Sequence, residues 1–433
     1  MRRLIRGERT PAPKSNLSRI TSALLIAVFL LVSAPTSPAY SVLTHEQIID
    51  FLWARHLKPL LHQRYPQATE DDLRQAHAFA YGGCLIQDMG YYPFGNKFFT
   101  DLTHYVRSGD FVMELLNDAQ DLNELAFALG AMAHYAADNT GHPIVNASVA
   151  QEFPDLRKKY GNNVTYAEGP TQHIRTEFGF DVLQVADQRY TSQAYHDFIG
   201  FQVAKPLLDR AFVAVYGIQL NQVLPDEDRT IGSYRRAVSK WIPELTKVAL
   251  VAKKKELEAV PNFEPRKFRY LLSQTEYQRE WGKNYERPGV GTKILAFFVR
   301  LLPKIRGMRS LDIKPPTPET EKMYIKSVEN TVTFYDKLLT AVETGQLQLA
   351  NRDFDTGNPT WPGEYALADK TYARLVRELA KNDFHGVTPA LRANILSFYS
   401  DPSRPIETKK HRKEWKETSN DLALLNGLHL GSP

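Results

Sequence analysis

The stretch His134-Tyr-Ala-Ala-Asp138-Asn-Thr-Gly-His142-Pro143 decides both the fold and the chemistry of this chain. It follows an apolar run, Leu122 to Ala133, that is rich in Leu, Ala, Phe and Met and therefore favours a helix. On a helix His134, Asp138 and His142 stand at i, i+4 and i+8, and side chains at this spacing share one face. Two imidazoles and a carboxylate on one face suit a borderline-soft cation such as zinc.

Gly141 and Pro143 predict that this helix ends near His142, which then lies on its last turn or just past it. A single His-x3-Asp pair would more often be polar side chains that face solvent. Here a third group follows in step, and further candidate ligands lie on either side. The pattern therefore favours a metal site over an ordinary amphipathic helix.

Candidates on the N-terminal side are His45, Asp88 and His104. Thr44 is a plausible N-cap, so His45 is predicted in the first turn of a helix. Gly82-Gly83 is expected to loosen a helix that precedes Asp88, which lies in a turn rich in Gly, Pro and aromatic residues. For a single Asp, a turn or capping role is the commoner alternative.

On the C-terminal side, a loop leads to Gln172-His173-Ile-Arg-Thr-Glu177, which again places His and Glu at i, i+4. Alone, this pair would more often lie on a protein surface. The other histidines before residue 100 (His56, His62 and His77) have no acidic residue in step and are interpreted as structural or surface residues.

The 433 residues are 43% hydrophobic and 24% charged, which is ordinary globular chemistry for a large core or two domains. The net charge of +5 comes from residues 1–39, which hold six basic residues and one acidic residue. The rest is neutral and gives no argument for nucleic-acid binding. The single cysteine, Cys84, cannot form an internal disulfide and is predicted to be a small buried residue.

Residues 1–39 are typical of a signal peptide: basic residues precede the apolar run Ile20 to Val32, and Ser37-Pro38-Ala39 fits a cleavage site. Cleavage would make Tyr40 the amino terminus and the protein exported. The alternative is an uncleaved anchor, but the apolar run is short for a membrane span of about 20 residues.

Taken in chain order, the candidate ligands on both sides of the central stretch resemble those of the zinc-dependent phospholipase C family. This family shares an all-helical fold and a trinuclear zinc site with S1/P1-type nucleases. The resemblance covers about half the chain, from Tyr40 to the mid-200s. The ordered set consists of His45, Asp88, His104, His134, Asp138, His142, His173 and Glu177.

The resemblance implies up to three zinc ions. Asp88, His104, His134 and Asp138 would hold one, and His142, His173 and Glu177 a second. The Tyr40 amine and carbonyl, His45 and a bridging Asp138 would hold the third.

Two departures from the family pattern are Tyr40 in place of the usual Trp and a short interval from Asp138 to His142. Glu177 is similar to the phospholipase branch, whereas the interval from Tyr40 to His45 is more like the nuclease branch.

Zinc lowers the pKa of bound water from near 16 to roughly 7, which gives a hydroxide that can attack phosphorus. The resemblance implies that Asp88 orients this water or acts as the general base. Four aromatic residues are candidates for lining the substrate cleft, with core packing as an equal alternative: Tyr81, Tyr91, Tyr92 and Phe94.

Residues 261–433 are predicted to form a helical C-terminal region of unknown role, after a catalytic domain at 40–260. Residues 287–309 combine basic residues with the apolar run Ile294 to Val299 and contain no acidic residue, which is compatible with peripheral contact to a membrane surface or with a buried helix that has basic ends.

The sequence thus predicts an all-α exported zinc hydrolase, most simply a phospholipase C that uses metal-activated hydroxide on phospholipid headgroups. The alternatives are an S1/P1-like single-strand nuclease and a non-enzymatic helical zinc protein. The neutral mature chain speaks against a nucleic-acid partner. The sequence gives no indication of oligomeric state.

Overall fold

The computed structural model describes residues 42–186, 201–238 and 316–428, and the first range only to residue 182 for side chains. These ranges are helical, and an isolated β-bridge between Arg352 and Pro359 is the only extended pairing in them. The predicted all-α class is confirmed. Residues 1–39, Tyr40, the boundary near 260 and the stretch 287–309 lie outside the described residues.

The helices from the first half are α2 (Val42–Leu52), the π-helix η1 (Trp53–Leu57), α3 (Lys58–Arg64), α4 (Glu70–Leu85), the 3-10 helix η2 (Ile86–Tyr91), α5 (Lys97–Tyr105), α6 (Ser108–Asn117), α7 (Leu122–Glu152), α8 (Pro154–Tyr160), α9 (Pro170–Ala186), α11 (Lys205–Tyr216), α12 (Leu220–Val223) and α13 (Glu227–Arg236). Those from the second half are α18 (Pro318–Glu343), α19 (Ala366–Lys381), α20 (Pro389–Phe398), the 3-10 helix η6 (Glu407–Lys410) and α21 (Arg412–Gly427).

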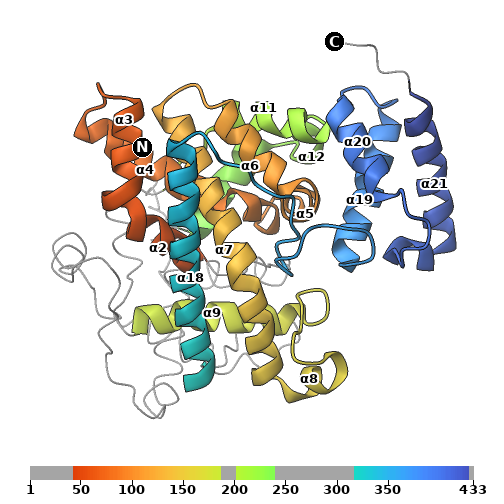
Figure 1. Ribbon diagram of the computed structural model, residues 1–433, viewed down its shortest axis with the longest axis horizontal. Helices are drawn as coiled ribbons and strands as arrows, with labels where there is room; N and C mark the ends of the chain where they lie inside the picture. The colour runs from red at the N-terminus through yellow and green to blue at the C-terminus, as the bar shows by residue number, and fades with distance from the viewer. Residues whose placement is uncertain (1–41, 187–200, 239–315, 429–433) are drawn as a thin grey trace, which may run out of the picture.

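Helix α7 is the centre of the molecule, and α4 and α18 pack along it (Figure 1). Its 31 residues begin behind Asp121, whose side chain accepts the Glu124 N–H as an N-cap. From Ala126 to Asp138 every side chain is buried, because neighbouring helices cover this segment on all sides. Polar residues in this segment therefore lie inside the protein, where they must be paired or bind a ligand.

The contact between α4 and α7 is close because glycines face each other across it. A Cβ atom on Gly83 would lie 1.9 Å from the Phe127 carbonyl oxygen, and one on Gly130 would lie 2.1 Å from the Ala80 carbonyl oxygen. The prediction that Gly82-Gly83 loosens the helix is wrong, since α4 continues to Leu85. These glycines bring two backbones together at the level of the site.

Helix α7 does not end near His142, as the sequence predicted, but continues through Pro143 to Glu152. A proline inside a helix costs about 3 kcal/mol, so tertiary packing must offset the loss. Val145 and Val149 are buried beyond it, and α8 and α9 pack against this part of α7. As a result His142 lies inside the helix, one turn after Asp138.

The start of α2 also differs from the prediction. Thr44 lies inside α2 and is not its N-cap, since the described helix already includes Val42. Asp181 of α9 accepts the Leu43 N–H at 3.0 Å and the Thr44 hydroxyl at 2.8 Å. A carboxylate from another helix therefore binds the end of α2 next to His45, which is favourable at a helix N-terminus.

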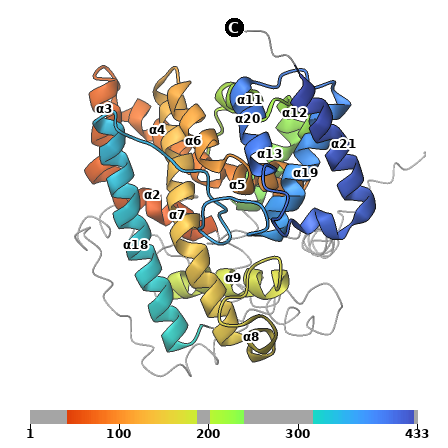
Figure 2. The same ribbon diagram turned by 45° about the vertical axis from the view of Figure 1, so that its right-hand side comes forward.

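The second half of the chain packs onto the same framework. Helix α18 lies along α7 and also contacts α2, and the segment between α18 and α19 crosses to the α5 side of the molecule, as Figure 2 shows. There α19 contacts α5, while α20 and α21 cover α19. Among the described helices, none is both long and apolar enough to span a membrane.

Candidate metal centre

Three helical turns of α7 carry His134, Asp138 and His142 on one face, and all three side chains are fully buried. The predicted i, i+4, i+8 arrangement therefore exists, and the continuation of the helix past Pro143 extends it to His142. Because water cannot reach these side chains, other elements of the chain must supply their partners.

The first group of donors surrounds His134. Its Nε2 lies 3.1 Å from Asp138 Oδ2, and His104 Nε2 from α5 lies 3.4 Å from the same oxygen. Asp88 from η2 completes this group, with its Oδ1 3.3 Å from His104 Nε2. The two imidazole Nε2 atoms are 3.5 Å apart. Two nitrogens and two carboxylates from η2, α5 and α7 therefore converge on one point.

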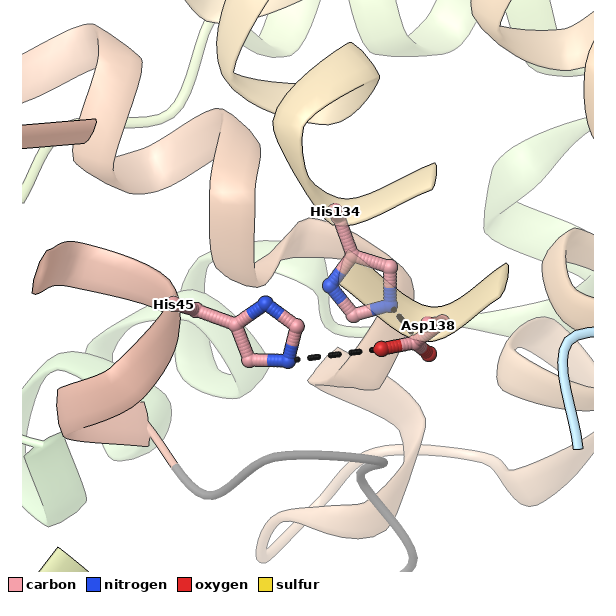
Figure 3. Close-up of side chains that lie close together, drawn as sticks. All are labelled: His45, His134 and Asp138. Atoms are coloured by element: carbon pink, nitrogen blue, oxygen red, sulfur yellow. Dashed lines mark ion pairs between the residues drawn. The ribbon is translucent and has the colours of Figure 1, made fainter. Parts of the chain in front are cut away.

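His45 of α2 adds a second group on the other side of Asp138. Its Nε2 lies 3.5 Å from Asp138 Oδ1, and its ring stacks on His134 with 4.5 Å between centroids (Figure 3). The two oxygens of Asp138 thus face different imidazoles, Oδ1 towards His45 and Oδ2 towards His104 and His134. This orientation is the geometry that a bridging carboxylate requires.

The third group joins α7 and α9. His142, His173 and Glu177 are close enough to share an ion, and His173 Nδ1 lies 2.9 Å from Glu177 Oε1. The buried atoms His142 Nε2 and Glu177 Oε2 have no hydrogen-bond partner among the described residues. The i, i+4 pair on α9 was therefore part of the cluster and not a surface pair.

In four of the candidate histidines the nitrogen that does not face the centre of its group is held by a hydrogen bond. The Nδ1–H groups of three histidines donate to backbone carbonyls: His104 to Thr100 at 2.9 Å, His134 to Cys84 at 2.9 Å and His142 to Phe354 at 2.7 Å. His173 differs, because its Nε2 donates to Asn146 Oδ1 at 2.7 Å and leaves Nδ1 towards Glu177. Such contacts set the tautomer and ring orientation of metal-ligating histidines.

The electrostatics of the centre favour a cation. Burial lowers the pKa of His104, but Asp138 and Asp88 outweigh that effect and raise the pKa to about 10. Although burial opposes it, His134 holds the pKa of Asp138 well below its usual value. Burial and the adjacent His134 lower the pKa of His45 to about 3, so this imidazole is neutral. Two buried carboxylates therefore attract positive charge beside a neutral nitrogen donor.

The donor set fits zinc. Zinc binds imidazole nitrogen and carboxylate oxygen in small sets, and each of the three groups offers both. Unsatisfied buried atoms lie where an ion would be: Asp88 Oδ1, both Asp138 oxygens, His142 Nε2 and Glu177 Oε2 have no hydrogen-bond donor within the described ranges. Leaving such atoms unpaired costs free energy that a bound metal would recover.

The remaining predicted residues divide between core and surface. Cys84 is buried as predicted, and burial raises its thiol pKa, so it is no nucleophile. His62 is exposed, whereas His77 is buried, with Nε2 3.0 Å from Asp50 Oδ1. The His56 ring contacts Asp336 of α18 at 2.9 Å. None of these histidines belongs to the three groups, as expected.

The four aromatic candidates also divide. Tyr81 is buried and donates its hydroxyl to Asp50, which makes it a core residue, and Tyr91 packs its edge against His104 with 6.3 Å between centroids. Tyr92 packs on Tyr234, while Phe94 is 54% exposed and lies under the Arg229 guanidinium. Tyr91 is thus in ring contact with a candidate ligand, His104.

Sequence reasoning missed residues that support the donors. Asp181 continues the α9 spacing after His173 and Glu177 by four residues, and this signal could have found it. Phe354 lies beside the rings of His104 and His134, and Asp355 Oδ1 lies 3.6 Å from His142 Nδ1. Both belong to an Asp-rich loop more than 170 residues downstream of Glu177, where no periodicity marks them.

Comparison with known families gives one result. Residues 44–224 match the model of the zinc dependent phospholipase C family, and all eight candidate side chains from His45 to Glu177 lie in that range. Comparisons with curated proteins and with solved structures found no match. The match implies a phosphodiester hydrolase that depends on zinc. Residues 44–224 of this chain are therefore similar to the zinc dependent phospholipase C family, which is the family that the sequence resembles.

Proposed function

We propose that the protein is an exported phospholipase C that hydrolyses the phosphodiester bond between the glycerol and the headgroup of a phospholipid. The observation that carries the proposal is the convergence of three buried His/Asp/Glu groups inside the segment that matches the family. Export follows from the signal peptide predicted in residues 1–39, and membrane contact through 287–309 is part of the proposal. Both segments lie outside the described residues.

We assign the ligands by group. Asp88, His104, His134 and Asp138 would hold one zinc, and His142, His173 and Glu177 a second. His45 and the second oxygen of Asp138 would hold a third, with the amine and carbonyl of Tyr40 as further ligands. When bound, zinc supplies a Lewis acid that activates water near neutral pH and neutralises phosphate oxygens.

The protein's own side chains would orient the attacking water and accept its proton. Asp88 Oδ1 has no hydrogen-bond donor among the described residues and lies at the edge of the first group. Burial raises the pKa of Asp88, which brings the carboxylate closer to the range of a working general base. We therefore assign Asp88 to orient the attacking water and accept its proton.

The test uses full-length protein, carrying a C-terminal tag and purified after export. Zinc content is measured by mass spectrometry, and hydrolysis is measured on phosphatidylcholine vesicles and on single-stranded DNA. We expect bound zinc, release of phosphocholine, loss of activity with chelator and recovery with zinc. Cleavage of DNA without lipid hydrolysis would instead identify a nuclease.

A pair of variants separates the site from general damage. His104→Ala should lose zinc and activity, whereas His62→Ala changes an exposed histidine outside the three groups and should keep both. Zinc content and activity that stay at the wild-type level in His104→Ala would refute the assignment of the first group.

A further inference from the structure

The third donor group depends on a loop that lies outside the family-matched residues. His142 Nδ1 donates to the Phe354 carbonyl oxygen at 2.7 Å, and Asp355 Oδ1 lies 3.6 Å from the same nitrogen. The opposite nitrogen, Nε2, is the one that is left for a ligand. A carbonyl and a carboxylate from the C-terminal region therefore lie against the non-ligating side of this imidazole.

Asp355 is fully buried, and its orientation is fixed. Its Oδ2 accepts the Tyr105 hydroxyl at 2.9 Å and also the Tyr365 hydroxyl, while Oδ1 has no hydrogen-bond donor among the described residues. The turn that carries it is closed by Asp353, whose Oδ1 accepts the Asp355 N–H at 2.8 Å. The carboxylate is thus anchored through one oxygen, and the other is directed towards His142.

The same loop also contacts the second imidazole of the group through Asn146. The Asn146 side chain donates to the Asp355 carbonyl oxygen at 2.8 Å and accepts from His173 Nε2 at 2.7 Å. His142 and His173 are therefore both oriented relative to Asp355, one directly and the other through an amide. Histidine ligands with such outer partners bind metal more strongly, because the partner fixes the ring and raises its basicity.

We propose that Asp355 is a positioning residue for the zinc held by His142, His173 and Glu177, so that the C-terminal loop is a working part of the metal centre. The inference rests on the proposed zinc chemistry. A carboxylate near His142 Nδ1–H stabilises the positive charge that spreads onto the imidazole when Nε2 binds a cation. Burial strengthens this effect, because water does not screen the pair.

The test is Asp355→Asn, which keeps the shape and removes the charge. We expect one zinc ion to be lost at a chelator concentration about 10- to 100-fold lower than for wild type, with the other ions retained. The cobalt-substituted protein should show a changed absorption spectrum for one site. Asp369→Asn is the matched control: Asp369 is buried in the same region and accepts the Gly363 and Glu407 N–H groups.

Both variants should lower the melting temperature, but only Asp355→Asn should change zinc affinity and the cobalt spectrum. Equal zinc affinity in Asp355→Asn, Asp369→Asn and wild type would overturn the proposal and leave Asp355 a structural residue. If Asp355→Asn does not fold, Tyr105→Phe removes one hydroxyl from Asp355 Oδ2 and should weaken the same zinc; unchanged affinity there would overturn it equally.

Failure of the proposed function gives a different result. Wild-type protein that binds zinc but hydrolyses no phospholipid would refute the substrate assignment, and the zinc measurements on Asp355→Asn would still decide this inference. Wild-type protein that binds no zinc would refute both.

Discussion

Replacement of Asp138 by Asn should remove more zinc than replacement of Glu177 by Gln. Asp138 Oδ1 faces His45, and its Oδ2 faces His104 and His134, so its charge serves two of the three groups. Glu177 belongs to the group of His142 and His173 alone. Both substitutions replace a buried carboxylate by an amide of the same shape, which makes them a matched pair.

The magnitude follows from the number of groups affected. At a zinc concentration 100-fold above a site's Kd, each occupied site stabilises the folded state by about 2.7 kcal/mol. Asp138→Asn is expected to empty two sites and lose about 5 kcal/mol of this zinc-dependent stability. Glu177→Gln empties one site and loses about half as much. Added zinc should therefore raise the melting temperature least for Asp138→Asn, more for Glu177→Gln and most for wild type.

The assay measures zinc per chain after dialysis against a weak chelator, the melting temperature with and without zinc, and phosphatidylcholine hydrolysis. Asp138→Asn should retain about one zinc and Glu177→Gln about two, if wild type holds three. Equal zinc content in Asp138→Asn and wild type would refute the bridging assignment. Equal losses in the two variants would show that Asp138 serves a single ion.

Three further outcomes are expected. Protein that begins at Tyr40 should bind one more zinc and turn over faster than protein with extra residues before Tyr40, because only a free amine can be a ligand; matching zinc counts and rates would exclude the amine. Asp181→Ala should lower unfolding free energy by about 1–3 kcal/mol in denaturant titration, since it leaves the buried Leu43 N–H without this acceptor; an unchanged midpoint would contradict this. Gly357→Ala should lower stability more than Gly345→Ala, although both glycines have positive φ. A Cβ on Gly357 would lie 2.7 Å from the Asn139 carbonyl oxygen, whereas one on Gly345 meets nothing within 4 Å. Equal losses of stability in thermal melts would show that the structure relaxes around the added methyl group.

Local spacing predicted the parts of the site that a single helix determines. His134, Asp138 and His142 share a face because a helix repeats every 3.6 residues, and His173 and Glu177 do so for the same reason. The end of α7 was predicted wrongly, because Gly141 and Pro143 are strong local signals of a helix end. Packing of Val145 and Val149 overrides them, and packing does not show in a local pattern.

Helical spacing alone could not predict that His45, Asp88 and His104 join the α7 face, because 30 to 89 residues separate each of them from His134. The ordered set of candidate ligands did predict it. A family resemblance predicts this because the ligands fall within the matched residues. Asp355 falls outside them, in a loop where Asp, Gly and Pro are as typical of turns as of a site. Asp353 does stabilise the turn by accepting the Asp355 and Thr356 N–H groups. Composition alone therefore could not distinguish an aspartate that closes the turn from one that lies at the site.

The position of the C-terminal loop has an energetic reason. The donors are withdrawn from water, and an incompletely paired buried carboxylate or imidazole is costly. Backbone carbonyls at Thr100 and Cys84 satisfy His104 and His134 from within the matched segment, but His142 lies further along α7. There the Phe354 carbonyl supplies the missing acceptor, and Tyr105 and Tyr365 hold Asp355 beside it. The region after residue 316 therefore completes the hydrogen bonding of a ligand that α7 carries but the matched segment leaves partly unpaired.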